Sequence, residues 1–303
     1  MSEHYPRIRI HTAHGHLLLR EGLSINFYMR RSHLEVARAV MSSLETYLRA
    51  VGPGAIGRYA NDAGEWQVLD DASWEVIRHK LLNRSKTLMT LHDALNGQYR
   101  YRFEYYGRPL DEPSREDRPG MVCGVSFWLP TEYLEEHGPG RVRELALELA
   151  APLPFCSGHA GLSFNGETEP LSLSGAEREL CFRYPGLDIP KLENLSCELG
   201  TRMRGASWLT FLGHPVLGEL GGAEGLRSRL SSVGSTVQEL EGDRAVITLG
   251  KWPEAGDTEQ GQMLPAYREL ARVLEPWLYR EERILHPAFF LDDVHRWERR
   301  FLD

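Results

Sequence analysis

The stretch GASWLTFLGHPVLGELGG, residues 205–222, decides the fold that this sequence predicts. Within it, residues 208–212 form an apolar run with the length of a buried strand, and a Gly-His-Pro break follows. A second break at Gly221-Gly222 precedes a helical pattern. The stretch contains no set of nucleophile, base or metal ligands, so we expect it to be buried structure rather than a site.

The elements predicted on either side of this stretch follow from apolar periodicity. Alternating apolar residues predict strands, with one buried face for the strand of residues 16–29, and apolar residues at three- and four-residue spacing predict helices. Ser32 is the predicted N-cap of a long helix that Gly52-Pro53-Gly54 ends, and Asp70 or Asp71 caps a second helix. The predicted strands cover residues 16–29, 66–69, 99–106, 121–129, 153–164, 206–212, 235–240 and 244–249, and further helices cover residues 141–150, 223–231 and 263–275.

The order strand, helix, strand, strand, helix recurs in the two halves of the chain. It predicts an α+β fold with two related layers of antiparallel sheet, each backed by helices. We expect an N-terminal α+β subdomain over residues 1–170, a connector over residues 171–200 and a C-terminal α+β subdomain with a tail over residues 201–303. One continuous domain is the alternative. With 303 residues, of which 42% are hydrophobic, the chain can bury a substantial core.

The net charge of −8 is placed unevenly along the chain. The formal charge is +3 for residues 1–100, −8 for residues 101–200 and −3 for residues 201–303. We do not expect direct binding to nucleic acid, because that requires cations that displace counterions from phosphate. A basic protein partner suits this charge better.

The sequence shows no recognisable targeting or membrane segment. No apolar run approaches the ~20 residues that a membrane helix needs, and residues 1–6 lack the basic start and apolar run of a signal peptide. We therefore expect a cytoplasmic protein without membrane contact. The four cysteines are widely spaced, and we expect them to be buried free thiols.

Patterns typical of enzymes are weak in this sequence. Residues 52–57 match G-x-G-x-x-G, but they close a helix, whereas the dinucleotide-binding motif follows a strand and opens a helix. The three histidines of residues 11–16 are loosely spaced for a metal site. Cys156 and His159 have no assignable third group for nucleophilic catalysis, and the acid-x-Lys pattern of restriction-endonuclease-like nucleases is missing. We expect no catalytic residue, no metal ligand and no cofactor.

Acidic loops beside aromatic residues are the most distinctive surface feature. A rim of carboxylates with aromatic anchors is suited to a cationic partner. Ordinary solvated loops are the alternative for any single cluster. The predicted contact residues are Asp111, Glu112, Glu116, Asp117, Trp128, Glu132, Glu135, Glu136, Glu167, Glu169, Trp252, Glu254, Asp257 and Glu259.

Glycine, proline and aromatic motifs over roughly residues 120–277 resemble those of a bacterial protein family. The motifs are Phe127-Trp128-Leu129-Pro130, Gly158-His159-Ala160-Gly161-Leu162, Tyr184-Pro185-Gly186-Leu187-Asp188, Trp208-Leu209-Thr210-Phe211-Leu212-Gly213, Gly221-Gly222 with Leu226 and Leu230, and Gly250, Pro253, Gly256-Asp257, Pro265 and Tyr267. The family is that of the type VI secretion immunity proteins, formerly a domain of unknown function. Its members are paired with VRR-Nuc and restriction-endonuclease-like nuclease toxins.

This resemblance implies a protein that binds a cognate secreted nuclease toxin and neutralises it by occluding its DNA-binding or active-site surface. Such toxins need a basic groove for DNA, so an acidic partner competes with phosphate and needs no catalysis of its own. Two other classes stay open on the residues alone: a metal- or thiol-dependent hydrolase, and a regulatory adaptor for a non-toxic partner. A hydrolase would lose its activity when His159 or Cys156 is replaced.

Joint charge reversal at Asp111, Glu112, Glu116 and Asp117 is expected to weaken protection against the toxin, because it removes anions predicted to meet the cationic partner. The measurement is the survival of cells that express the toxin together with the altered or the unaltered protein. Equal survival of the two would place the interface elsewhere.

Overall fold

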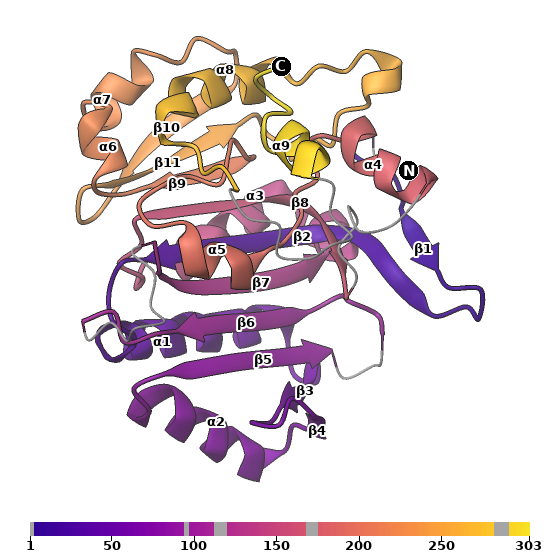
Figure 1. Cartoon of the computed structure of the whole chain (residues 1–303), viewed down its shortest axis with the longest axis vertical. Helices are drawn as coiled ribbons and strands as arrows, with labels where there is room; N and C mark the ends of the chain where they lie inside the picture. Colours follow the sequence, from indigo (N-terminus) through magenta and orange to yellow (C-terminus); the bar gives the residue numbers. More distant parts are fainter. Residues whose placement is uncertain (1–2, 94–96, 112–119, 168–174, 282–290) are drawn as a thin grey trace. The chain divides into compact units, whose positions relative to one another are not determined.

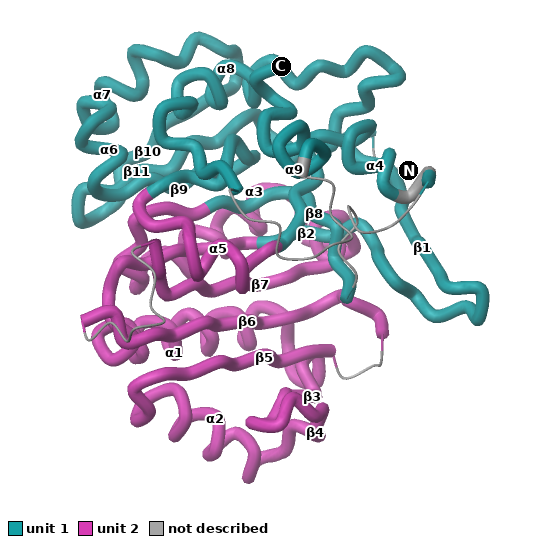
Figure 2. Tube along the Cα trace, viewed as in Figure 1, with its two compact units in different colours: residues 1–24, 159–190, 202–303 teal, residues 25–158, 191–201 magenta. Residues whose placement is uncertain are grey.

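The computed structural model describes residues 3–93, 97–111, 120–167, 175–281 and 291–303. The fold is α+β with antiparallel strand pairing, as the sequence predicted (Figure 1). The chain divides into two compact units that are each discontinuous in sequence (Figure 2). Unit 1 is Met1–Ser24, His159–Pro190 and Arg202–Asp303, and unit 2 is Ile25–Gly158 and Lys191–Thr201. Within the described ranges, no helix combines the length and the apolar character that a membrane crossing requires.

Unit 2 contains an antiparallel sheet with strands in the order β7-β6-β5-β3-β4. The strands are β3 (Ile56–Ala60), β4 (Trp66–Val68), β5 (Thr87–Asp93), β6 (Arg102–Gly107) and β7 (Cys123–Pro130). The register pairs Phe103 with Phe127 and Tyr105 with Val125, and all four side chains are fully buried. Cross-strand pairs of this kind stabilise a sheet and form the core of this unit.

Helices cover both faces of the unit 2 sheet. They are α1 (His33–Val51), α2 (Asp71–Asn83), α3 (Thr131–Ala150) and α5 (Leu192–Glu198). Phe127 meets Tyr47 of α1, with the ring centroids 5.3 Å apart. On the same strand, a Cβ atom at Gly124 would lie 3.0 Å from Leu192 of α5. Because residues 124 and 127 point to opposite faces of a strand, α1 and α5 lie on opposite sides of the sheet (Figure 1).

The helices α1 and α2 begin at the residues that the capping signals predicted. The Glu35 carboxylate accepts a hydrogen bond from the Ser32 N–H at 2.8 Å, and the Asp70 carboxylate accepts one from the Ser73 N–H at 2.8 Å. The helix α1 ends before Gly52, whose φ of 84° favours glycine. The G-x-G-x-x-G match therefore follows a helix and leads into β3, the reverse of the order in a dinucleotide site.

In unit 1 the apolar part of residues 205–222 is buried, from Trp208 to Gly213, whereas His214, Gly218 and Glu219 are exposed. The strand β9 (Leu209–Leu212) pairs with β11 (Arg244–Leu249), which pairs with β10 (Ser235–Leu240). Trp208 is only 1% exposed, and its Nε1–H donates to the Gly250 carbonyl at 3.3 Å. Gly161 of β8 (Ser157–Gly166) lies beside Trp208: a Cβ atom there would be 3.6 Å from it, an ordinary van der Waals contact.

The remaining elements of unit 1 are short. They are β1 (Arg9–His11), α4 (Ala176–Arg183), α6 (Val216–Glu219), α7 (Gly222–Arg227), η2 (Thr258–Gln260), α8 (Pro265–Leu274), η3 (Glu275–Trp277) and α9 (Leu291–Glu298). The helices α4 and α5 fall inside residues 171–200, which the sequence predicted as a connector. With about two turns each, they offer too little periodicity to be recognised.

The strand β2 (Leu17–Met29) corrects one prediction from the sequence. Its alternating apolar residues predicted a single buried face, yet every residue from 19 to 29 is buried. The polar positions have partners inside the protein: the fully buried Glu21 accepts the Ile8 N–H at 2.8 Å and pairs with Arg9. Alternation in the sequence shows which side chains are polar but not which are exposed, because a polar side chain that has hydrogen-bond partners inside the protein can be buried.

A cluster of buried charges surrounds Asp188 in unit 1. The carboxylate lies 3.0 Å from His159 Nε2 on β8, 3.8 Å from Arg204 Nε and 4.0 Å from Arg300 Nη2. Arg204 also lies 3.5 Å from the Glu298 carboxylate. These side chains are all at least nine-tenths buried. The Arg300 Nε–H donates to the Pro185 carbonyl at 2.7 Å, so the cluster joins the end of the chain to the segment before Asp188.

The cluster shifts the titration of its members. Burial alone would raise the pKa of Asp188, but the hydrogen bond with His159 and the charges of Arg204 and Arg300 hold that pKa well below its usual value. Burial lowers the pKa of Arg300 to about 9, against the opposing effect of Asp188. Both groups are therefore charged at neutral pH, and each compensates the other inside the protein.

Replacement of Asp188 by asparagine is expected to lower the free energy of unfolding by about 3 kcal/mol at pH 7, because it leaves buried arginines without their anion. The pKa of Asp188 is lower in the folded than in the unfolded chain, so its contribution is present above about pH 5 and is lost as the pH falls. The difference between wild type and Asp188→Asn in urea titrations should shrink below about pH 4. The exposed Asp243→Asn is the control and should show no such difference.

Candidate functional site

The loop of residues 252–259 in unit 1 carries four of the predicted contact residues. Trp252 is half-buried and stacks on His4, with ring centroids 4.9 Å apart and an interplanar angle of 10°. The Glu254 carboxylate is 53% exposed and lies 3.8 Å from His4 Nδ1. The backbone joins the same two segments, because the Ala255 N–H donates to the His4 carbonyl at 2.8 Å. The loop thus presents an aromatic ring and a carboxylate on a supported surface.

Asp257 and Glu259 of this loop share one arginine. Arg183 Nε and Nη2 donate to the two oxygens of Asp257 at 3.1 and 2.8 Å, and Arg183 Nη1 lies 2.6 Å from Glu259. The hydrogen bonds from Arg183 lower the pKa of Asp257. Asp257 is only 5% exposed, whereas the Glu259 side chain is 66% exposed. Glu254 and Glu259 therefore carry the accessible charge of the loop. The buried Asp257 holds the loop against Arg183.

A close backbone contact holds the loop in place. The Gly186 N–H donates to the Ala255 carbonyl at 2.7 Å, and a Cβ atom at Gly186 would lie 1.9 Å from the Glu254 carbonyl. Only glycine fits this approach. Beside it, a pocket of about 270 Å³ is lined by residues of the loop together with His4 and Tyr184.

Sequence reasoning missed His4, Arg183 and Gly186 as parts of this surface. His4 and Arg183 are far from the loop in sequence, and no local pattern links them to it. Gly186 had one signal, since it lies in the Tyr184 to Asp188 motif on which the family resemblance partly rested. Glycine is the residue that permits close approach of two backbones.

A second acidic surface lies at the beginning of α3 in unit 2. Glu135 and Glu136 are exposed, and Glu132 is half-buried. Trp128, which was predicted as an aromatic neighbour of these acids, is 3% exposed and lies under Arg102, whose Cζ is 4.8 Å from the ring centre. Its side chain is therefore not available at the surface.

Asp111 is separated from the α3 acids within unit 2. It is exposed and follows β6, which runs antiparallel to β7, so it lies near the start of β7. The acids of α3 follow the end of β7, and an eight-residue strand spans roughly 25 Å. Of the other predicted contacts, Glu167 is exposed in unit 1. Glu112, Glu116, Asp117 and Glu169 lie outside the described residues.

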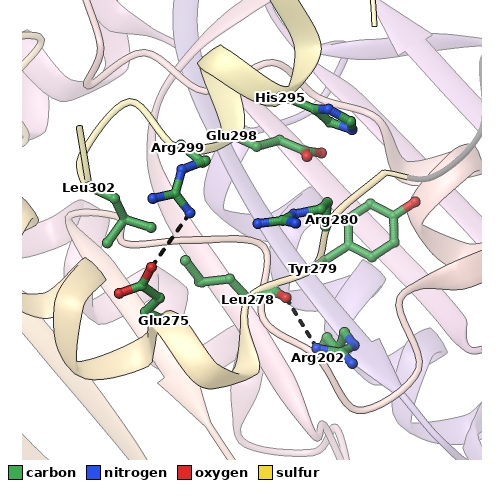
Figure 3. A pocket seen from close by; sticks show the side chains of 9 residues that line it. All are labelled: Arg202, Glu275, Leu278, Tyr279, Arg280, His295, Glu298, Arg299 and Leu302. Atoms are coloured by element: carbon green, nitrogen blue, oxygen red, sulfur yellow. Dashed lines mark hydrogen bonds and ion pairs between the residues drawn. The ribbon is translucent and has the colours of Figure 1, made fainter. Parts of the chain in front are cut away.

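Another pocket lies elsewhere in unit 1. It has a volume of about 530 Å³ and is lined by Arg202, Arg280, Arg299, His295, two glutamates and apolar side chains (Figure 3). Arg299 pairs with Glu275 at 3.5 Å and with Asp303 at 3.2 Å. None of the predicted contact residues lines this pocket, in which three arginines stand against two glutamates.

The residues considered for catalysis have structural partners. The Cys156 thiol donates to the Tyr28 carbonyl at 3.1 Å, and burial raises its pKa, which is the opposite of an activated thiolate. His159 is bonded to Asp188 in the buried cluster. Within the described residues, no three His, Cys, Asp or Glu side chains lie together as a metal site requires.

The comparisons with known proteins agree with the family resemblance. Residues 39–301 match the TsiV family, described as type VI immunity for VRR-NUC. A search of curated proteins gave no match. Among solved structures, the chain is similar to the Pseudomonas aeruginosa T6SS protein PA0821, with 20% identity and a TM-score of 0.78 over 97% of this chain and 87% of that chain. That likeness concerns the fold, whereas the family match spans most of the sequence. The chain therefore belongs to the TsiV family of type VI immunity proteins for VRR-NUC.

Proposed function

We propose that this protein binds a cognate VRR-Nuc toxin and neutralises it by covering the surface with which the toxin grips DNA. The family match over residues 39–301 is the observation that carries the proposal. The protein acts by occupation and without turnover. The toxin's DNA groove is basic, because a nuclease must attract a polyanion, and a negatively charged protein competes for the same groove.

The acidic loop of residues 252–259 is the contact surface that we propose in unit 1. Three carboxylates stand there against one guanidinium, that of Arg183, so the loop keeps negative charge. Trp252 adds an aromatic ring held by His4. Such a combination supports both steps of tight binding, since exposed charge accelerates association and a buried aromatic anchor slows dissociation. In unit 2 we propose Glu132, Glu135 and Glu136 as further contacts.

The double variant Glu254→Lys/Glu259→Lys is expected to slow association with the toxin by about tenfold at low salt, because both side chains are exposed and face solvent. Surface plasmon resonance with a catalytically inactive toxin measures the rate, and protection is scored by cell survival. Glu224→Lys/Glu241→Lys makes the same change in charge at exposed positions outside the surface and should leave the rate near that of wild type. Equal association rates for the two double variants would mean that the loop is not part of the interface.

Gly186→Ala is expected to displace the loop, because the added Cβ atom would overlap the Glu254 carbonyl. We expect a loss of about 1–3 kcal/mol in the free energy of unfolding, as in overpacked sites, and weaker binding to the toxin. Gly218→Ala is the control, since a Cβ atom there meets nothing within 4 Å. Unchanged toxin binding by a folded Gly186→Ala protein would mean that the loop position does not matter for recognition.

A further inference from the structure

Two helices of unit 2 present matching residue spacings to a shared pocket. Side chains at positions i, i+3, i+4 and i+7 lie on one face of a helix. The pocket has a volume of about 310 Å³. Its lining residues are Met41, Leu44, Glu45 and Leu48 on α1 and Asp71, Trp74, Glu75 and Arg78 on α2, and each set follows that spacing.

The pocket has an apolar floor and an acidic rim. Leu44 is fully buried, while Met41, Leu48 and Trp74 are half-buried and keep part of their surface toward the opening. Glu45 is exposed on α1 and Asp71 is exposed on α2. The pocket therefore combines apolar area, which favours a ligand that brings apolar surface, with charge at its edge.

The described residues leave part of the negative charge of the rim without a cationic partner. Glu75 pairs with Arg78 at 3.3 Å on the same helix. The carboxylates of Glu45 and Asp71 form no hydrogen bond or ion pair with another described residue. Two negative charges thus remain at the mouth of the pocket, on two different helices.

We infer that this pocket is a socket for one basic side chain, arginine or lysine, of the partner protein. The inference rests on the proposed function, since the partner is the VRR-Nuc toxin. A basic side chain has an apolar stem and a charged head. The stem packs against Met41, Leu48 and Trp74, and the head lies between Glu45 and Asp71.

Other ligands fit this site less well. A purely apolar group would take water from the two carboxylates without giving them a partner, which costs free energy. An anion would be repelled by the rim. A guanidinium or ammonium also gains from the face of a tryptophan ring, and tryptophan is enriched among the residues that dominate binding energy.

The test is the dissociation constant between this protein and a catalytically inactive form of its cognate VRR-Nuc toxin, measured by isothermal titration calorimetry. Trp74→Ala removes the floor and is expected to raise Kd about thirtyfold. Glu45→Arg reverses a charge of the rim at an exposed helix position and is expected to raise Kd at least about tenfold. The controls Trp66→Ala and Glu224→Arg alter the same residue types outside the pocket and should leave Kd within about twofold.

The outcomes separate this inference from the proposed function. If wild type binds the toxin and both pocket variants bind as tightly, the socket is wrong and the proposed function stands. If wild type does not bind the toxin, the proposed function fails and the socket fails with it. Circular dichroism verifies folding, and should Trp74→Ala not fold, Glu45→Arg decides alone because its side chain packs against no core.

Discussion

Unit 1 depends on the compensation of one buried carboxylate, that of Asp188. Its partners come from distant parts of the sequence: His159 from β8, Arg204 from the segment before β9, and Arg300 from the end of the chain. A buried charge that loses its partners costs several kcal/mol, so these segments are stable only together. Asp188 also lies two residues after Gly186, whose backbone N–H donates to the acidic loop. The position of the proposed contact surface therefore depends on electrostatics in the core.

The parts of the fold that local signals determine could be predicted from the sequence. The apolar run around Trp208 is a buried strand, the α1 helix begins at the Ser32 cap, and the helix after Asp70 has the hydrogen bond expected of its cap. Each of these rests on residues within one or two turns of each other, where periodicity and capping act. The α+β class followed from the order of such elements, and the family followed from motifs of glycine, proline and aromatic residues.

The remaining features depend on contacts between residues that are far apart in the sequence, and local patterns do not reveal such contacts. The burial of β2 on both faces requires partners such as Arg9 for Glu21, and no alternation pattern reveals them. At the candidate surface, the sequence identified Glu254 and Glu259 as acidic and exposed, but it did not indicate that Arg183 neutralises part of the loop. The pocket between α1 and α2 was also missed, since its two halves look like ordinary amphipathic helices until they face each other.

The participation of Arg300 in the buried cluster has a genetic consequence. The Arg300 codon encodes a cation that lies over the Trp297 ring at 3.5 Å and compensates a carboxylate in the interior. A premature stop or frameshift upstream of this codon would remove this cation and leave the buried Asp188 carboxylate without one of its partners. If the protein neutralises its toxin as proposed, such a truncation would remove that protection.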